Sequence, residues 1–399
     1  MLTPLGLSAS FGFGDRIGLA TPAHIAAVRG TGFAPVFAQQ SVRENTRTGR
    51  TPQEVMADAA RAVEAAGWQD AWGADADHLK TPADLPAFVA AGYTFYTIDP
   101  GEHVDNAADT DPVAVLREKA AAASRGTGRE LEWDALAARY LCASVAEPAW
   151  GSFGEETLLR AVAKYGHAIT HTVEMFRQLA GLKDDFDFEV SVDESDSPTT
   201  PLEHFFIASE LTRAGVRFTS LAPRFIGRFE KGVDYIGDLG ALDAELARHA
   251  AVTRHFESYK LSLHSGSDKF SVYPLIVRHW GARIHVKTAG TSYLEALRTL
   301  AVTEPVLFRR ILELARERYP ADRATYHVSA DVAQVPATPT DAELPGLLDD
   351  CHAREVLHVT FGSALAQHGT EVKAALVRHA GVYQANLQHH LGRHLALLR

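Results

Sequence analysis

Three segments of the chain repeat one order of signals, in which a capped helix ends at a glycine and a strand-like run follows at once. Each helix is expected to begin at a threonine, with proline next and a carboxylate three residues after the threonine, at Thr51, Thr81 and Thr200. The hydroxyl and the carboxylate are the two halves of a capping box, and proline favours the first helical position. The expected helix ends are Gly67, Gly92 and Gly215. Repeated helix-to-strand alternation predicts an α/β fold.

The number of strand-like runs favours a barrel. Ten runs are found, ending near Arg16, Gln40, His78, Asp99, Glu194, Arg224, His264, Lys287, Asp331 and Thr360. A TIM-type (β/α)8 barrel needs eight strands. Residues from about 106 to 182 instead have the pattern of consecutive helices. We therefore predict a single TIM-type barrel domain over residues 1–399 with a helical insertion at about 106–182, and an open doubly wound sheet stays the alternative.

Composition excludes several classes of protein. The chain has 39 basic and 50 acidic residues, a net charge of −11, and no basic run that would suit a nucleic-acid partner. Its two cysteines, Cys142 and Cys351, support neither a disulfide framework nor a thiolate zinc cluster. No stretch approaches the roughly 18 apolar residues of a membrane span, and no signal peptide is recognisable. We expect a cytoplasmic enzyme of a small molecule, with no nucleic-acid or membrane partner.

Polar residues are dense at the expected strand ends, where the loops of βα proteins build their sites. GADADHLKT (73–81) brings Asp77 and His78 together, which suits a base beside a metal ligand. FEVSVDES (188–195) ends in Asp193 and Glu194, and strand alternation leaves open which of the two faces the site. Helix capping or salt bridging is the alternative role for these carboxylates.

Two later strands end in donor-rich loops. LSLHSGSDKF (261–270) delivers His264 and then Asp268 and Lys269, a loop suited to a hydroxylated or anionic ligand. HVKTAGTSYLEAL (285–297) puts His285 and Lys287 on one strand face before a helix expected to be capped by Ser292. A helix N-terminus can hold an anion. A solvated turn and an ordinary capped helix are the alternatives.

Nineteen histidines make imidazole chemistry worth testing, although a lone histidine is more often structural. No local spacing matches a zincin motif, so a metal has to be assembled from several strands. The expected ligands are His78, His264 and His285, with His358 in reserve.

FGFGDRIG (11–18) departs from the dinucleotide fingerprint in its glycine spacing, and no acidic residue ends the next strand. Neither a nucleophile elbow nor a phosphate-binding P-loop occurs. Polar residues at these strand ends are therefore predicted to contact substrate. The predicted substrate contacts are Arg16, Gln40, Asp193, Arg224, Asp268, Lys269 and Lys287.

Taken together, FGFGDRIG, GADADHLKT, FEVSVDES with PLEHFFIASEL, LTRAGVRFTSLAPRF, LHSGSDKFSVYP and HVKTAGTSYLEALR resemble the tagaturonate epimerase family over most of the chain. The resemblance implies a TIM-like fold, a divalent metal such as Zn, Mn, Ni or Co, and interconversion of fructuronate and tagaturonate, which differ at C4. Members are also similar to enzymes that epimerise fructose and tagatose. The chain looks shorter than some relatives.

Inversion at C4 constrains the mechanism, because the C4 hydrogen lies β to a C2 ketone and simple enolisation does not reach it. A metal-assisted retro-aldol cleavage of C3–C4 is one route. Asp77 and Glu194 would be the catalytic acid and base, and Arg16, Lys269 or Lys287 would face the carboxylate. A Schiff base on Lys287 and a transient oxidation by bound NAD are other routes. A class II-type sugar aldolase or isomerase and a noncatalytic sugar sensor are the alternative functions.

Overall fold

Eight parallel strands close into a barrel in which every strand pairs with its neighbours in chain order and β8 pairs with β1. The computed structural model describes residues 1–125, 132–142, 147 and 149–399. The strands are β1 (Ser10–Phe13), β2 (Ala34–Ser41), β3 (Gly73–Leu79), β4 (Phe95–Ile98), β5 (Asp187–Ser191), β6 (Ser220–Ala222), β7 (Lys260–Leu263) and β8 (Ile284–Thr288). The predicted TIM-type barrel is confirmed, and the open sheet is not formed.

Strands of a closed parallel barrel are covered on both faces, so they favour apolar residues at successive positions. β4, with the sequence FYTI, is buried throughout. The interior turns polar toward the carboxyl ends, where the register pairs Gln39 with Asp75 and Ser41 with Asp77. Paired residues of neighbouring strands point to the same face, so these four side chains share the barrel interior.

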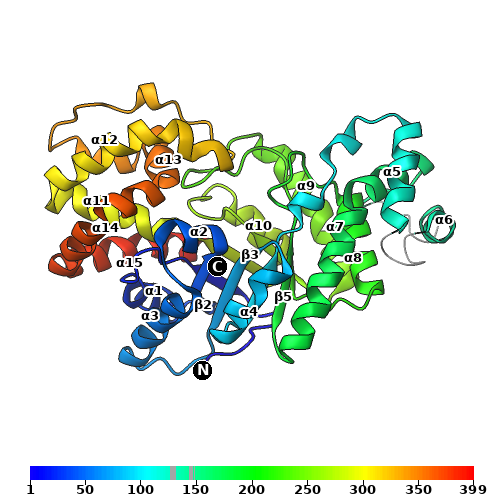
Figure 1. Cartoon of the computed structure of the whole chain (residues 1–399), viewed down its shortest axis with the longest axis horizontal. Coiled ribbons are helices and arrows are strands. Elements are labelled where there is room, and N and C mark those ends of the chain that lie inside the picture. The colour runs from blue at the N-terminus through cyan, green and yellow to red at the C-terminus, as the bar shows by residue number, and fades with distance from the viewer. Residues whose placement is uncertain (126–131, 143–146, 148) are drawn as a thin grey trace.

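Helices cover the outside of the barrel (Figure 1). The α-helices of the βα units, apart from the segment between β4 and β5, are α1 (Thr21–Val28), α2 (Val42–Thr48), α3 (Pro52–Ala65), α4 (Leu85–Ala90), α8 (Pro201–Arg213), α9 (Leu239–Phe256), α10 (Tyr273–Trp280) and α11 (Thr291–Thr303). The predicted capping boxes form at Thr51, Thr81 and Thr200, and an N-cap of this kind typically contributes about 1 kcal/mol. The predicted ends have positive φ angles, at Gly67, Gly92 and Gly215.

The segment between β4 and β5 is helical, as predicted, in its described residues. It contains α5 (Val113–Arg125), α6 (Trp133–Tyr140) and α7 (Glu155–Leu182). α7 packs against α4 and α8 and so takes its place in the ring around the barrel, whereas α5 and α6 lie outside that ring (Figure 1). The parts of the predicted insertion at residues 126–131, 143–146 and 148 lie outside the described residues. None of the helices in the described ranges, the 28-residue α7 included, is long and apolar enough to cross a membrane.

A second group of helices follows the barrel and lies on the opposite side from α5 and α6 (Figure 1). Its members are α12 (Pro305–Asp322), α13 (Cys351–Val359), α14 (Phe361–Arg378) and α15 (Ala380–Leu397). The predicted strands ending near Asp331 and Thr360 are wrong. Asp331 caps a 3-10 turn, and Thr360 follows α13. A short apolar run such as VLHV fits a strand and a buried helix equally well, and here it is a buried helix.

Candidate active site

The carboxyl ends of the strands open into two adjoining cavities. The inner one holds about 50 Å³ and the outer one about 320 Å³. They share lining residues from three loops, Lys231, His264, Ser265 and Tyr326. The cavities therefore lie at the mouth of the barrel, where TIM-type enzymes carry their chemistry.

Lys287 is the centre of a buried ion cluster at the floor of the inner cavity. Its Nζ lies 2.7 Å from Asp75, 2.8 Å from Asp77 and 2.9 Å from Glu189. Burial by itself would lower the pKa of Lys287, but these three carboxylates outweigh it and raise the pKa. Burial raises the pKa of Asp75 to about 7, against the attraction of Lys287. Lys287 is thus a fixed cation at neutral pH and Asp75 is the carboxyl of the cluster that is readiest to carry a proton.

His264 links this cluster to the outer cavity. Its Nε2 lies 2.6 Å from Glu189 Oε1, and its Nδ1 lies 3.1 Å from Asp193 Oδ1 and 3.2 Å from Ser191 Oγ. A carboxylate on one ring nitrogen is the usual way to orient a metal-binding imidazole so that the other nitrogen faces the ion. Glu189 therefore holds His264 with Nδ1 toward the cavity.

His78 completes the arrangement from β3, in a left-handed backbone conformation with a φ angle of 50°. Its Nδ1 is 3.4 Å from Asp99 Oδ2, and its Nε2 is 3.8 Å from Asp77 Oδ1. Burial disfavours the charged ring, yet the carboxylates of Asp77 and then Glu194 outweigh it and raise the pKa of His78 to about 10. Negative charge is thus in excess around this imidazole.

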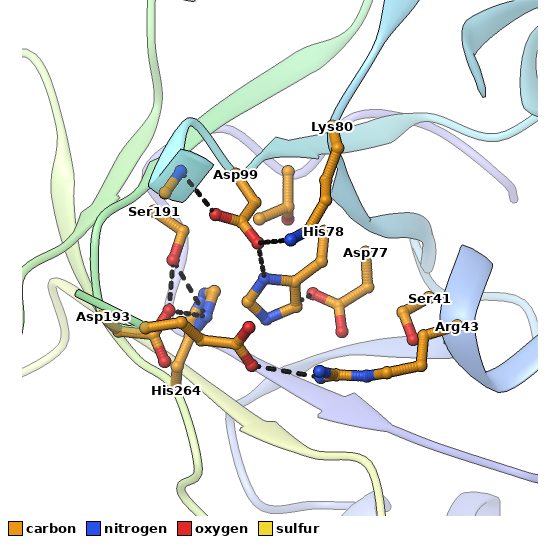
Figure 2. Close-up of polar contacts among 12 residues, drawn as sticks. Ser41, Arg43, Asp77, His78, Lys80, Asp99, Ser191, Asp193 and His264 are labelled. Atoms are coloured by element: carbon orange, nitrogen blue, oxygen red, sulfur yellow. Dashed lines mark hydrogen bonds and ion pairs between the residues drawn. The ribbon is translucent and has the colours of Figure 1, made fainter. Parts of the chain in front are cut away.

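Figure 2 shows His78, Asp193 and His264 converging on one space, although they come from three different strands or strand ends. Their ligand atoms lie within 4.8 Å of one another, as do those of the overlapping set His78, Asp99 and Glu194. His78 Nδ1 and Asp99 Oδ2 are buried and lie 3.4 Å from each other, without a hydrogen bond of ordinary geometry among the described residues. Two imidazoles with carboxylates suit Zn, Mn, Co or Ni, so the donor set fits the divalent cation that the sequence predicted.

His285 stands apart from this set. It lies two residues before Lys287 on β8 and so deeper in the barrel, paired with Ser10 where Lys287 pairs with Gly12, and its Nδ1 is 2.9 Å from Ser10 Oγ. Burial keeps the pKa of His285 well below its ordinary value, so the ring is neutral. His285 shares the face of Lys287, as alternation predicted, but two residues of depth separate it from His78 and His264.

Both Asp193 and Glu194 reach the outer cavity. β5 ends at Ser191, so the two carboxylates lie in the turn beyond it, where strand alternation no longer applies. Glu194 Oε1 is 3.0 Å from Arg43 Nη2. Burial opposes its ionisation, but His78 and then Arg43 outweigh burial and lower the pKa of Glu194.

Among the predicted substrate contacts, Gln40 is misplaced by one residue. A register irregularity between Val36 and Ala38 shifts the alternation of β2, so Gln39 faces the inner cavity and Gln40 does not. Gly12 leaves the room for it, because a Cβ at that position would lie 1.7 Å from Gln39 Oε1. Gly12 is therefore part of the barrel interior and not of a nucleotide-binding turn.

Asp268 and Lys269 are structural and do not line either cavity. Lys269 donates to the backbone carbonyls of Glu230, Val233 and Ser267. Asp268 is bound by Arg354 at 2.9 Å and by His390 at 2.6 Å. The donor-rich loop after β7 is thus fixed in place by its own polar residues, and ligand contacts from it are left to Ser265 and Ser267.

Three other predicted positions are in the cavities. Arg16 and His358 line the inner cavity and Arg224 lines the outer one. His358 comes from α13 and not from a strand. The N-cap of α11 is also two residues earlier than expected, at Gly290, and the Ser292 hydroxyl instead bonds His24 Nε2 at 2.7 Å.

Arg43, Lys231 and Tyr326 were not found from the sequence, although all three line the inner cavity. Lys231 and Tyr326 lie outside any regular helix or strand, and Arg43 lies in the first turn of the short α2. Periodicity carries no signal for such positions. Asp99 did have a signal in the sequence, since it directly follows the strand β4.

A family model described as tagaturonate epimerase matches residues 3–398. The chain belongs to the tagaturonate epimerase family. The tagaturonate/fructuronate epimerase of Thermotoga maritima is 44% identical over 402 residues, which cover 98% of this chain and 81% of that protein. Two crystal structures of fructuronate-tagaturonate epimerase UxaE from Cohnella laeviribosi, one native and one with glycerol, each superpose with a TM-score of 0.92 at 38% identity. They cover 99% and 100% of this epimerase and 83% of the matched chains.

Proposed function

We propose that this epimerase interconverts tagaturonate and fructuronate by inverting C4, with a divalent cation held by His78, Asp193 and His264. Family membership supports the reaction class. The convergence of three ligand atoms within 4.8 Å at the barrel mouth carries the proposal of a metal. When bound there, a divalent cation supplies Lewis-acid polarisation of the C2 ketone.

The chemistry follows from the position of the inverted carbon. The C4 hydroxyl loses its proton, the C3–C4 bond breaks, and its electron pair passes to C3 and the C2 ketone as an enediolate while C4 becomes an aldehyde. Half a turn about C4–C5 presents the other face of the aldehyde to C3. The bond then reforms, and the C4 oxygen regains a proton.

Asp77 and Glu194 are the groups proposed to move this proton. Both lie beside His78, Asp77 at 3.8 Å and Glu194 in the set whose ligand atoms are within 4.8 Å. Burial works against ionisation of Asp77, but Lys287 and then His78 outweigh it and lower its pKa, as His78 and Arg43 do for Glu194. Each is therefore ionised and can accept a proton, and the proton returned to C4 oxygen is the one just accepted.

A Schiff base on Lys287 is the rival route, and the ion cluster argues against it. A nucleophilic lysine needs a neutral amine. Three carboxylates within 3 Å of Nζ instead keep this amine protonated.

The test compares two buried histidines of adjacent strands. His264→Gln is expected to lose both bound metal, measured by elemental analysis, and conversion of fructuronate, measured by chromatography. His285→Gln, whose side chain lies outside the ligand set, is expected to retain stoichiometric metal. Full turnover by wild-type protein after exhaustive chelation, or equal metal content in the two variants, would contradict the proposed site.

A further inference from the structure

The cations around the inner cavity differ in how they are paired. Lys287 contacts three carboxylates, Arg43 contacts Glu194, and Arg16 contacts Glu44 at 2.8 Å. Lys231 instead donates to the Ser265 hydroxyl at 2.7 Å, and no carboxylate of the described residues lies within 4.0 Å of it. Lys231 lines both cavities, so it brings to their junction a positive charge that no direct ion pair holds, although it attracts Asp193 and Glu194 at longer range.

Two further groups face the same corner. Arg16 has its Nη1 buried and without a hydrogen-bond partner in the described chain, although its other nitrogens hold Glu44. Gly290, the N-cap of α11, lines the cavity and has no side-chain cap. The first N–H groups of a helix are donors aimed at an anion. A guanidinium nitrogen, an ammonium group and a helix N-terminus thus line one cavity, and all three act on His358.

The fold holds this corner in place and keeps it positive. Arg354 donates to the carbonyl oxygen of Gly232 at 2.6 Å and also binds Asp268, which ties the Lys231 loop to the loop after β7. His358 lies against Gly290. Burial lowers the pKa of His358 well below its ordinary value, and Arg16 and Lys231 lower it further. The ring is neutral and can donate one N–H without adding charge.

We infer that Lys231, Arg16 Nη1 and the N-terminus of α11 form the subsite for the substrate carboxylate, and that Lys231 sets the preference for ketohexuronates over neutral ketohexoses. The same two cavities carry His78, Asp193, Glu194 and His264, where the ketone and C4 react. An extended ketohexuronate has its ketone and its carboxylate at opposite ends. Lys231, Arg16 Nη1 and the N-terminus of α11 offer donors for the carboxylate end, and charge-assisted hydrogen bonds to carboxylate are strong enough to select for it.

This inference rests on the proposed function, and its experiment separates the two. Lys231→Met and Lys231→Arg are compared with Lys119→Met, which removes a cation from α5, away from both cavities. Lys231→Met is expected to raise the KM for fructuronate at least tenfold, equivalent to about 1.4 kcal/mol, with kcat changed less than threefold. Lys231→Arg should recover part of the loss, and Lys119→Met should match wild type.

Binding without turnover supplies the second readout. D-gluconate bears a carboxylate but no ketone, and D-glucitol is its neutral counterpart. Calorimetry should show that the wild type prefers gluconate and that Lys231→Met loses this preference, even if fructuronate proves not to be the substrate. A fall in kcat at constant KM, or equal weakening of both probes by Lys231→Met, would overturn the subsite. Unaltered thermal unfolding of the variant excludes a folding defect as the cause.

Discussion

Replacing Lys287 by methionine tests how far the barrel depends on its central cation. Nζ lies within 3 Å of three buried carboxylates from β3 and β5, while Lys287 itself is on β8. Its loss leaves Asp77 and Glu189 charged and without their lysine partner, and breaking a buried ion pair in this way costs about 3–5 kcal/mol. The pKa of Asp75, about 7, means that this carboxyl can take up a proton and limit the cost.

The expected cost converts to a shift in melting temperature. Unfolding entropy is about 2.1 cal/mol/K per residue, which for 399 residues is about 0.8 kcal/mol/K. A loss of 3–5 kcal/mol therefore lowers Tm by about 4–6 °C. Differential scanning calorimetry at pH 7.5 measures it directly.

Two further variants make the result interpretable. Lys231→Met removes a partly exposed cation bound to a hydroxyl and should lower Tm by no more than about 1 °C. Adding Asp77→Asn to Lys287→Met removes a buried carboxylate that lies 2.8 Å from Lys287 in the wild type and should recover at least about 1 kcal/mol. If Lys287→Met melts within 1 °C of wild type, the three carboxylates do not depend on Lys287 and the argument fails.

Three other predictions concern positions around the site. Gly290→Ala would place a Cβ 1.8 Å from His358 Nε2 and should destabilise the protein by about 1–3 kcal/mol; Gly392→Ala, which meets no atom within 4 Å, should not, and equal Tm values would contradict this. Asp268→Asn leaves Arg354 buried with a weaker partner and should cost more in urea unfolding than Asp243→Asn, whose Arg278 partner is exposed; the reverse order would refute the anchoring role. Burial, reinforced by Glu230, raises the pKa of Glu355 to about 8. The folded state therefore binds a proton that the unfolded state releases, so stability falls as pH rises from about 5 to 8. Glu355→Gln should flatten that fall by about 1–2 kcal/mol in urea titrations at pH 5.5 and 8.5, and an unchanged slope would contradict the shifted pKa.

The barrel could be predicted because its helix signals are local. Thr51, Thr81 and Thr200 each specify a helix start through contacts within four residues, and glycine specifies the ends. The two predicted strands that do not form, ending near Asp331 and Thr360, were instead inferred from runs whose structure depends on distant contacts. VLHV is short and apolar, and the helices packed around it decide whether it forms a strand or a helix. No local sequence pattern indicates that packing.

The part of the candidate site at the strand ends could be predicted from the sequence, whereas the part that loops contribute could not. Asp77, His78, His264 and Lys287 meet because parallel strands bring their carboxyl ends to one edge. The structure places Gln39 and not Gln40 at the inner cavity, because one register irregularity in β2 reverses which of its alternate side chains face the barrel interior. His285 was assigned to the right face but the wrong depth. Lys231 belongs to a loop whose course depends on Arg354, more than a hundred residues later.

The anchoring of Asp268 constrains the order in which the enzyme can be assembled during synthesis. A nascent chain that has emerged as far as β7 already contains His78, Asp193 and His264. Its barrel is still open, because β1 closes only on β8, and Asp268 still lacks Arg354 and His390. The proposed metal ligands are thus made well before the residues that anchor Asp268, so a ribosome-bound chain stalled before α13 should be inactive although it carries every proposed ligand.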